Sequence, residues 1–148
     1  MDAINPLLTT TWTMVCEDLH GFSNRFFDRL FTAYPSLRAS SQHLDARAQD
    51  RHLRAILDAL VNGRLSTSRL IALGRRYAGR GIRSAHYAVI VQTLLWVLEQ
   101  HLGASWTLVV HNAWDDALTR AASVMVASDR RQRFGGLLGD NLVLFPCA

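Results

Sequence analysis

A polar stretch in the middle of the chain carries its most distinctive chemistry. In the segment 73–87, LGRRYAGRGIRSAHY, Tyr77 stands between Arg76 and Arg80, and Tyr87 closes the stretch. An arginine forks onto carboxylates and phosphates, and a tyrosine carries a hydroxyl group that can donate and accept a hydrogen bond. Tyr77 either uses this hydroxyl in a binding site or fills space, with its hydroxyl bonded to a neighbour. The residue types alone leave both interpretations open.

The remaining histidines and cysteines form no recognisable catalytic or metal-binding motif. None of the histidines has the helical spacing of a zinc site such as HExxH. Cys16 and Cys147 stand near opposite ends of the chain, and nothing in the sequence gives them a reason to pair. A glycine-rich phosphate loop and a nucleophile elbow are both missing from the sequence. We therefore expect a binding protein more than an enzyme.

Composition and charge exclude several classes of partner. The chain has 148 residues, 49% of them apolar, which is enough for one domain with a buried core. All 16 basic residues are arginines and the net charge is +4, but no aromatic residues are interleaved with the arginine clusters as in a nucleic-acid platform. We expect no nucleic-acid partner. Without a membrane span or a secretory signal pattern, we also expect a cytoplasmic protein with no membrane partner.

The elements that must position these residues are helices, because apolar residues recur at spacings of three and four along most of the chain. Asn5-Pro6 is a predicted helix start, and Gly21 a predicted break. Ser84 and Ser105 are predicted N-caps of the two long helices that end the fold. The predicted helices after the break cover about 22–34, 47–61, 69–79, 85–102 and 106–128, with a short new start at Pro35.

Four segments, taken in order, resemble one family. TTTWTMV, FSNRFFDRLFTAYPSLR, AQDRHLRAILDALV and the long run that begins LIALGRRYAGRGIRSAHY are similar to bacterial single-domain globins, especially to the globin domain of flavohaemoglobins. The resemblance covers about residues 6–128 and rests on the order and spacing of the segments. It implies one all-α, globin-like domain over 1–148, with six to seven main helices. Residues 129–148 would form a C-terminal tail that packs on the body or on a partner.

The resemblance also implies a haem between a distal helix and a proximal helix. It places Tyr77 where the family has the proximal histidine that binds the iron, which makes Tyr77 a possible haem iron ligand. The distal tyrosine of the family falls at Phe27, so its hydroxyl is missing. Gln49 matches the distal glutamine, with Leu53 one turn further along the same helix.

Further residues complete the implied pocket. Tyr87 matches a tyrosine that supports the proximal histidine, and Ile82 is expected beside it. Arg76 and its neighbour Arg80 either face haem propionates or lie on the surface. His86 precedes Tyr87 as a histidine often does in the family without binding iron. His52 lies next to the distal face, and packing or solvent is the favoured interpretation for it.

Two functions follow from these residues. In the first, the chain binds haem with Tyr77 at the proximal position and acts as a sensor or in redox chemistry, because a tyrosinate favours ferric iron over the ferrous state that carries oxygen. In the second, it is a haem-free globin-fold module for regulation or interaction, with a filled pocket or an apolar ligand. The second function predicts a pocket filled by Phe27, Leu53, Tyr77 and their neighbours, and the first predicts an open pocket. The apolar residues of 88–98 fit either function, because such a helix is either deeply buried or partly covered by a second subunit. The resemblance makes a homodimer through the last two helices possible.

Overall fold

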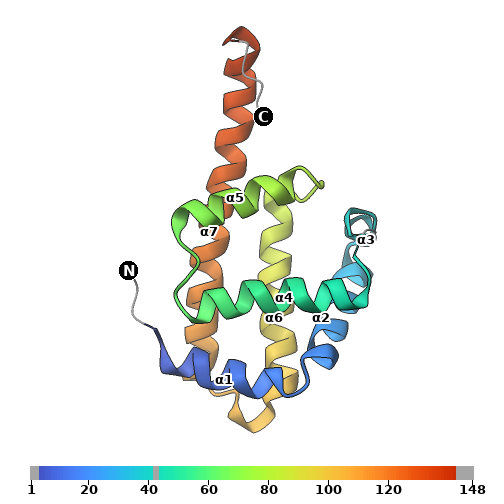
Figure 1. The fold of residues 1–148 in the computed structure, drawn as a ribbon, viewed down its shortest axis with the longest axis vertical. Helices are drawn as coiled ribbons and strands as arrows, with labels where there is room; N and C mark the ends of the chain where they lie inside the picture. Colours follow the sequence, from blue (N-terminus) through green and yellow to red (C-terminus); the bar gives the residue numbers. More distant parts are fainter. Residues whose placement is uncertain (1–3, 42–43, 143–148) are drawn as a thin grey trace.

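The computed structural model describes residues 4–41 and 44–142, and this part of the chain folds into seven α-helices and one short 3-10 helix (Figure 1). In chain order they are α1 (Pro6–Cys16), α2 (Leu19–Ala33), α3 (Pro35–Ser40), α4 (Ala46–Val61), α5 (Thr67–Ala78), α6 (Ser84–Leu102), η1 (Gly103–Ser105) and α7 (Leu108–Leu142). The predicted all-α fold with six to seven main helices is confirmed.

The two longest helices form the spine of the molecule. The turn at η1 reverses the chain, so that α6 and α7 run side by side in opposite directions (Figure 1). On this pair α5 packs against α7 and α2 packs against α6, while α1 contacts α4, α6 and α7. The core between them contains Trp114, Val97, Leu98 and Phe22, all essentially without exposed surface. None of the described helices is both long and apolar enough to span a membrane.

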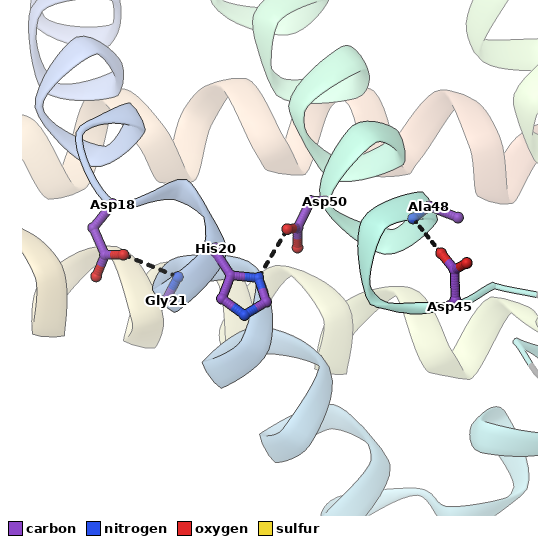
Figure 2. A network of polar contacts seen from close by, with 6 residues as sticks. All are labelled: Asp18, His20, Gly21, Asp45, Ala48 and Asp50. Carbon is purple, nitrogen blue, oxygen red and sulfur yellow. Dashed lines mark hydrogen bonds and ion pairs between the residues drawn. The ribbon is translucent and has the colours of Figure 1, made fainter.

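Short side chains fix where the first helices begin. Asn5 caps α1 by accepting the N–H of Leu7 at 2.9 Å, as its position before Pro6 predicts. The carboxylate of Asp18 caps α2 by accepting the N–H of Gly21 at 3.2 Å (Figure 2). The predicted break at Gly21 is therefore wrong. The interruption falls just before α2 because Asp18 starts a new helix, and Gly21 lies inside it.

Polar contacts join α4 to the two helices beside it. Asp45 caps α4 by accepting the N–H of Ala48 at 2.8 Å, and Figure 2 shows this cap next to the start of α2. Between the two starts, Nδ1 of His20 lies 2.9 Å from a carboxylate oxygen of Asp50. Further along α4, Asp58 accepts a hydrogen bond from the indole N–H of Trp12 on α1. The position of α4 is thus set from both α1 and α2.

The bounds of the last helix differ from the prediction at both ends. Its first turn is capped by Thr107, whose hydroxyl accepts the N–H of Val110 at 3.2 Å, and the predicted cap Ser105 belongs to η1. The predicted end near residue 128 is also wrong. No proline interrupts the chain before Pro146, and the helix continues past Gly135, Gly136 and Gly139 to Leu142 and projects beyond the other helices (Figure 1). Residues 143–148, with most of the predicted apolar tail, lie outside the described residues.

Candidate functional site

A partly open cavity of about 350 Å³ lies between the helices. Its wall is contributed mainly by α2, α4, α5, α6 and α7, and it is lined almost entirely by aliphatic and aromatic side chains. Buried members of the wall include Phe26, Leu30, Leu57, Leu94 and Leu118. Cavities of roughly 300–1,000 Å³ with apolar walls and a few polar groups are typical small-molecule sites. We therefore treat this cavity as the candidate site.

Most of the residues that the sequence predicted for a pocket line this cavity. They are Phe27, Leu53, Arg76, Tyr77, Ile82 and Tyr87. Gln49 is partly buried but does not line the cavity. On α4 the wall begins at His52 and continues toward the end of the helix, whereas Gln49 lies almost one turn nearer its start. Gln49 is thus separated from the other six predicted residues.

The end of α5 brings its polar residues to the same side of the cavity. The helix stops at Ala78, and Gly81 adopts a positive φ of 93° that few other residues tolerate. This turn lets the N–H of Ile82 reach back to the carbonyl oxygen of Tyr77 at 3.0 Å, and the N–H of Arg80 bonds the same oxygen at 2.9 Å. The sequence GRGI is thus folded so that Arg80 and Ile82 line the cavity beside Tyr77.

The central polar contact of the site joins α4 to α5. His52 Nε2 and the hydroxyl oxygen of Tyr77 lie 2.7 Å apart, a hydrogen-bond distance, and their rings are 5.8 Å apart between centroids. The sequence favoured packing or solvent for His52, and the structure places it in the wall of the cavity instead. The available signal was its spacing, since His52, Ile56 and Leu60 repeat every four residues along one face of α4.

The surroundings of Tyr77 hold its phenol in the neutral form. Burial raises the pKa of Tyr77 well above its usual range, and the nearby Tyr87 adds to the rise, while Arg76 and Arg80 pull the pKa down more weakly. The phenol therefore keeps its proton near neutral pH and can donate it to His52 Nε2 when that nitrogen carries no hydrogen. This hydrogen bond gives the phenol a partner inside an apolar wall.

His86, the other predicted alternative ligand, has a structural role. Its Nδ1 accepts the backbone N–H of Arg83 at 2.8 Å, which caps the start of α6, and its ring packs edge-on against Tyr34. It does not line the cavity. Within the described residues, no group of three or more histidine, cysteine, aspartate or glutamate side chains is arranged to hold a metal ion.

The arrangement of His52 and Tyr77 does not fit the haem that the resemblance implies. A porphyrin lying between a distal and a proximal helix separates side chains on opposite faces of its ring. If His52 and Tyr77 were to hold a haem iron from its two faces, the iron would have to stand between their donor atoms. The two donor atoms here are 2.7 Å apart and bonded to each other. A ring placed between α4 and α5 would have to break this contact.

Comparisons with known proteins agree with the helical arrangement. A sequence model of the globin family, described as Globin, matches residues 24–125. The chain is 26% identical over 133 residues to hemoglobin subunit alpha-D of Branta canadensis, an alignment that covers 84% of this chain and 94% of that subunit. The same subunit of Aythya fuligula is 24% identical over the same coverage.

A solved bacterial structure is similar over most of its length. It is the crystal structure of protein PA3967 from Pseudomonas aeruginosa PAO1, described as structurally highly homologous to a human hemoglobin. The two chains are 26% identical with a TM-score of 0.73, and the match covers 83% of this chain and 95% of that one. Because the family model spans more than half of the residues, the chain belongs to the globin family.

Proposed function

We propose that this globin binds an apolar small molecule in its cavity and does so without a haem iron between α4 and α5. The observation that carries the proposal is the direct contact between His52 and Tyr77, which closes the space a porphyrin would need while a cavity of about 350 Å³ stays open beside it. Of the two haem-free forms that the sequence leaves open, the open cavity favours an apolar ligand over a filled pocket. The chain would then work as a ligand-responsive regulatory or interaction module.

The apolar wall supports this function energetically. Side chains such as Leu53 and Leu57 are almost fully buried at the cavity surface. Apolar surface removed from water stabilises a complex by about 25 cal/mol per Å², and a cavity that is already formed adds little cost of reorganisation to binding. The few polar groups of the wall supply orientation, as in other small-molecule sites.

A neutral apolar dye tests the proposal. Nile red, whose emission rises in apolar surroundings, is expected to bind the purified chain saturably. Ala122 lines the cavity from α7, so the larger side chain in Ala122→Leu should fill part of the cavity. The affinity for Nile red should fall by about tenfold or more. Ala72 is exposed on α5 and does not line the cavity, which makes Ala72→Leu the matched control with unchanged binding. Equal binding by both variants, or no saturable binding at all, contradicts the proposal.

A second candidate function is binding of ferric haem through Tyr77, in a sensor or redox role. The observation that favours it is that Tyr77 lies in the wall of an open cavity with two arginines beside it. It requires the contact between Tyr77 and His52 to open and the phenol to lose its proton. The resemblance to flavohaemoglobins likewise stays a prediction.

Haemin titration decides between the two candidates. If Tyr77 is a ligand, added haemin gives a stoichiometric Soret band with a ferric-phenolate charge-transfer feature, and Tyr77→Phe abolishes it. If the haem-free proposal holds, haemin produces no saturable Soret change. A stoichiometric band that survives in Tyr77→Phe would assign the iron to another residue.

A further inference from the structure

We propose that the groove between α2 and α6 is a second binding site, which takes a small zwitterion such as an amino acid. The groove offers a volume of about 560 Å³ and is lined by side chains of both helices, among them Arg25, Asp28, Arg29, Thr32, Trp96 and Gln100. None of these residues lines the apolar cavity. The proposal therefore goes beyond the proposed function and holds whether or not the cavity binds a ligand.

The arginines of the groove have hydrogen-bond donors to spare. The guanidinium carbon of Arg29 lies 3.8 Å from the ring centroid of Trp96, so the cation is held over the indole. This contact satisfies none of the five N–H donors of the guanidinium group. Within the described residues, neither Arg29 nor Arg25 donates a side-chain hydrogen bond or forms an ion pair. Guanidinium donors match the two oxygens of a carboxylate, which makes a carboxylate the expected partner.

A carboxylate of the chain itself also lines the groove without a partner. Asp28 accepts the hydroxyl hydrogen of Thr32 at 2.8 Å, but it does so through its backbone carbonyl oxygen. In the part of the chain that the structure describes, the carboxylate of Asp28 forms no ion pair and no hydrogen bond. It repels a simple anion and attracts an ammonium group. A ligand that carries both charges therefore suits the groove better than a ligand that carries either one alone.

The spacing of residues along α2 keeps the two signs of charge from pairing with each other. The neighbours four residues away from Asp28 are Asn24 and Thr32, and neither is charged. In α4 and α7, by contrast, exposed arginines pair with aspartates at that spacing. Arg29 follows Asp28 directly, and adjacent residues of a helix do not face each other. Both signs of charge thus remain available to a ligand.

An ordinary solvated helix face is the other explanation for these charges. Such a face has exposed charges too, but it has no preference for a ligand that carries both signs. Arg38 belongs to a face of this kind and provides a matched control. It is also an exposed arginine over an aromatic ring, 5.1 Å from the ring centroid of Phe31, and it does not line the groove.

NMR of the isotopically labelled chain, titrated with γ-aminobutyrate, butyrate and butylamine at constant ionic strength, tests the proposal. The three probes share a carbon skeleton, and only γ-aminobutyrate carries both charges. The chain has 4 tryptophans, and Trp96→Phe identifies the indole N–H signal of Trp96 as the reporter. We expect γ-aminobutyrate to shift this signal saturably in the roughly millimolar range, because exposed charges attract weakly. Its affinity should exceed that of either other probe by about fivefold or more.

Three variants show which side chain recognises which charge. Arg29→Gln should lower the affinity for γ-aminobutyrate toward that of butylamine, and Asp28→Asn should lower it toward that of butyrate. Arg38→Gln should leave it unchanged. Circular dichroism spectra confirm that each variant is folded before its affinity is compared.

Several results would overturn the proposal. They are a missing saturable shift with γ-aminobutyrate, equal affinity for all three probes, and a loss in Arg38→Gln as large as that in Arg29→Gln. Nile red binding, measured on the same samples, reports on the cavity alone and should be the same in all three variants. A failure of the dye to bind contradicts the proposed function and leaves the groove site standing.

Discussion

At the scale of single residues, the site is organised by one pair of polar side chains in an apolar wall. His52 and Tyr77 come from positions 25 residues apart in the sequence and meet at hydrogen-bond distance in the wall of the cavity. Each would lose its water on burial, and each supplies the other with a partner. The pair explains why a tyrosine can occupy the position at which the resemblance places a histidine. Its hydroxyl reaches the opposite helix and bonds there.

The raised pKa of Tyr77 predicts how stability depends on pH. The folded chain holds the phenol proton more tightly than the unfolded chain, whose tyrosines titrate near pH 10. The stabilisation is therefore fully present below about pH 10 and is lost as the pH rises above it, because deprotonation then favours the unfolded chain. Urea unfolding should show a steeper loss of stability above about pH 10 in the wild type than in Tyr77→Phe.

A direct titration provides the control for this prediction. The chain has 3 tyrosines, and the tyrosinate absorbance of the folded wild type should include one that titrates later than free tyrosine. That late component should disappear in Tyr77→Phe. Identical alkaline titration of the two proteins, once the number of tyrosines is corrected for, would show that the hydroxyl of Tyr77 is not held in a buried contact.

At the scale of elements, the cavity depends on how closely α5 approaches α7. Gly74 faces the backbone of α7, and a Cβ atom built at this position would stand 3.2 Å from the carbonyl oxygen of Met125 and 3.3 Å from its Cα. These distances are tighter than ordinary contacts, and the backbone of a helix cannot move aside as a side chain can. Gly74 therefore sets the position of the helix that carries Tyr77.

Gly74→Ala is accordingly expected to destabilise the chain. Overpacking typically costs about 1–3 kcal/mol, and the better helix propensity of alanine returns up to about 1 kcal/mol of this. Gly79→Ala is the matched control, because a Cβ atom there would lie 3.5 Å or more from its neighbours and its φ of −63° suits alanine. Thermal unfolding should show a lower Tm for the first variant only. Equal Tm values would mean that α5 does not pack on α7 as closely as described.

Sequence reasoning succeeded at this scale where the signal was local. Asn5-Pro6 predicted the start of α1 because both residues act on their own turn. The break predicted at Gly21 was wrong because a glycine can lie inside a helix. The carboxylate of Asp18 caps the new helix and so fixes where α2 begins. The contribution of His52 to the cavity wall was not predicted. Tertiary packing decides which face of α4 lies toward α5, and the sequence of α4 shows only the spacing of the residues on that face.

At the scale of the whole molecule, the globin arrangement encloses a cavity whose residues come mainly from five helices, α2, α4, α5, α6 and α7. The order and spacing of the segments that resemble bacterial globins predicted this fold. Whether an open cavity would remain could not be predicted, because it depends on how side chains from separate helices meet. Leu108 and Val109, at the start of α7, are 74% and 63% exposed and lie outside the core. The predicted homodimer through the last two helices stays a prediction.

The central claim is that a small apolar molecule occupies the cavity beside the contact between His52 and Tyr77. Methyl-detected NMR of the isotopically labelled chain, titrated with Nile red, tests it most directly. The account predicts saturable shifts at methyl groups that line the cavity, such as those of Leu53, Ile56 and Leu118, with those of Leu108 and Val109 unchanged. Shifts confined to the exposed methyl groups of Leu108 and Val109, with the cavity residues unaffected, would contradict it.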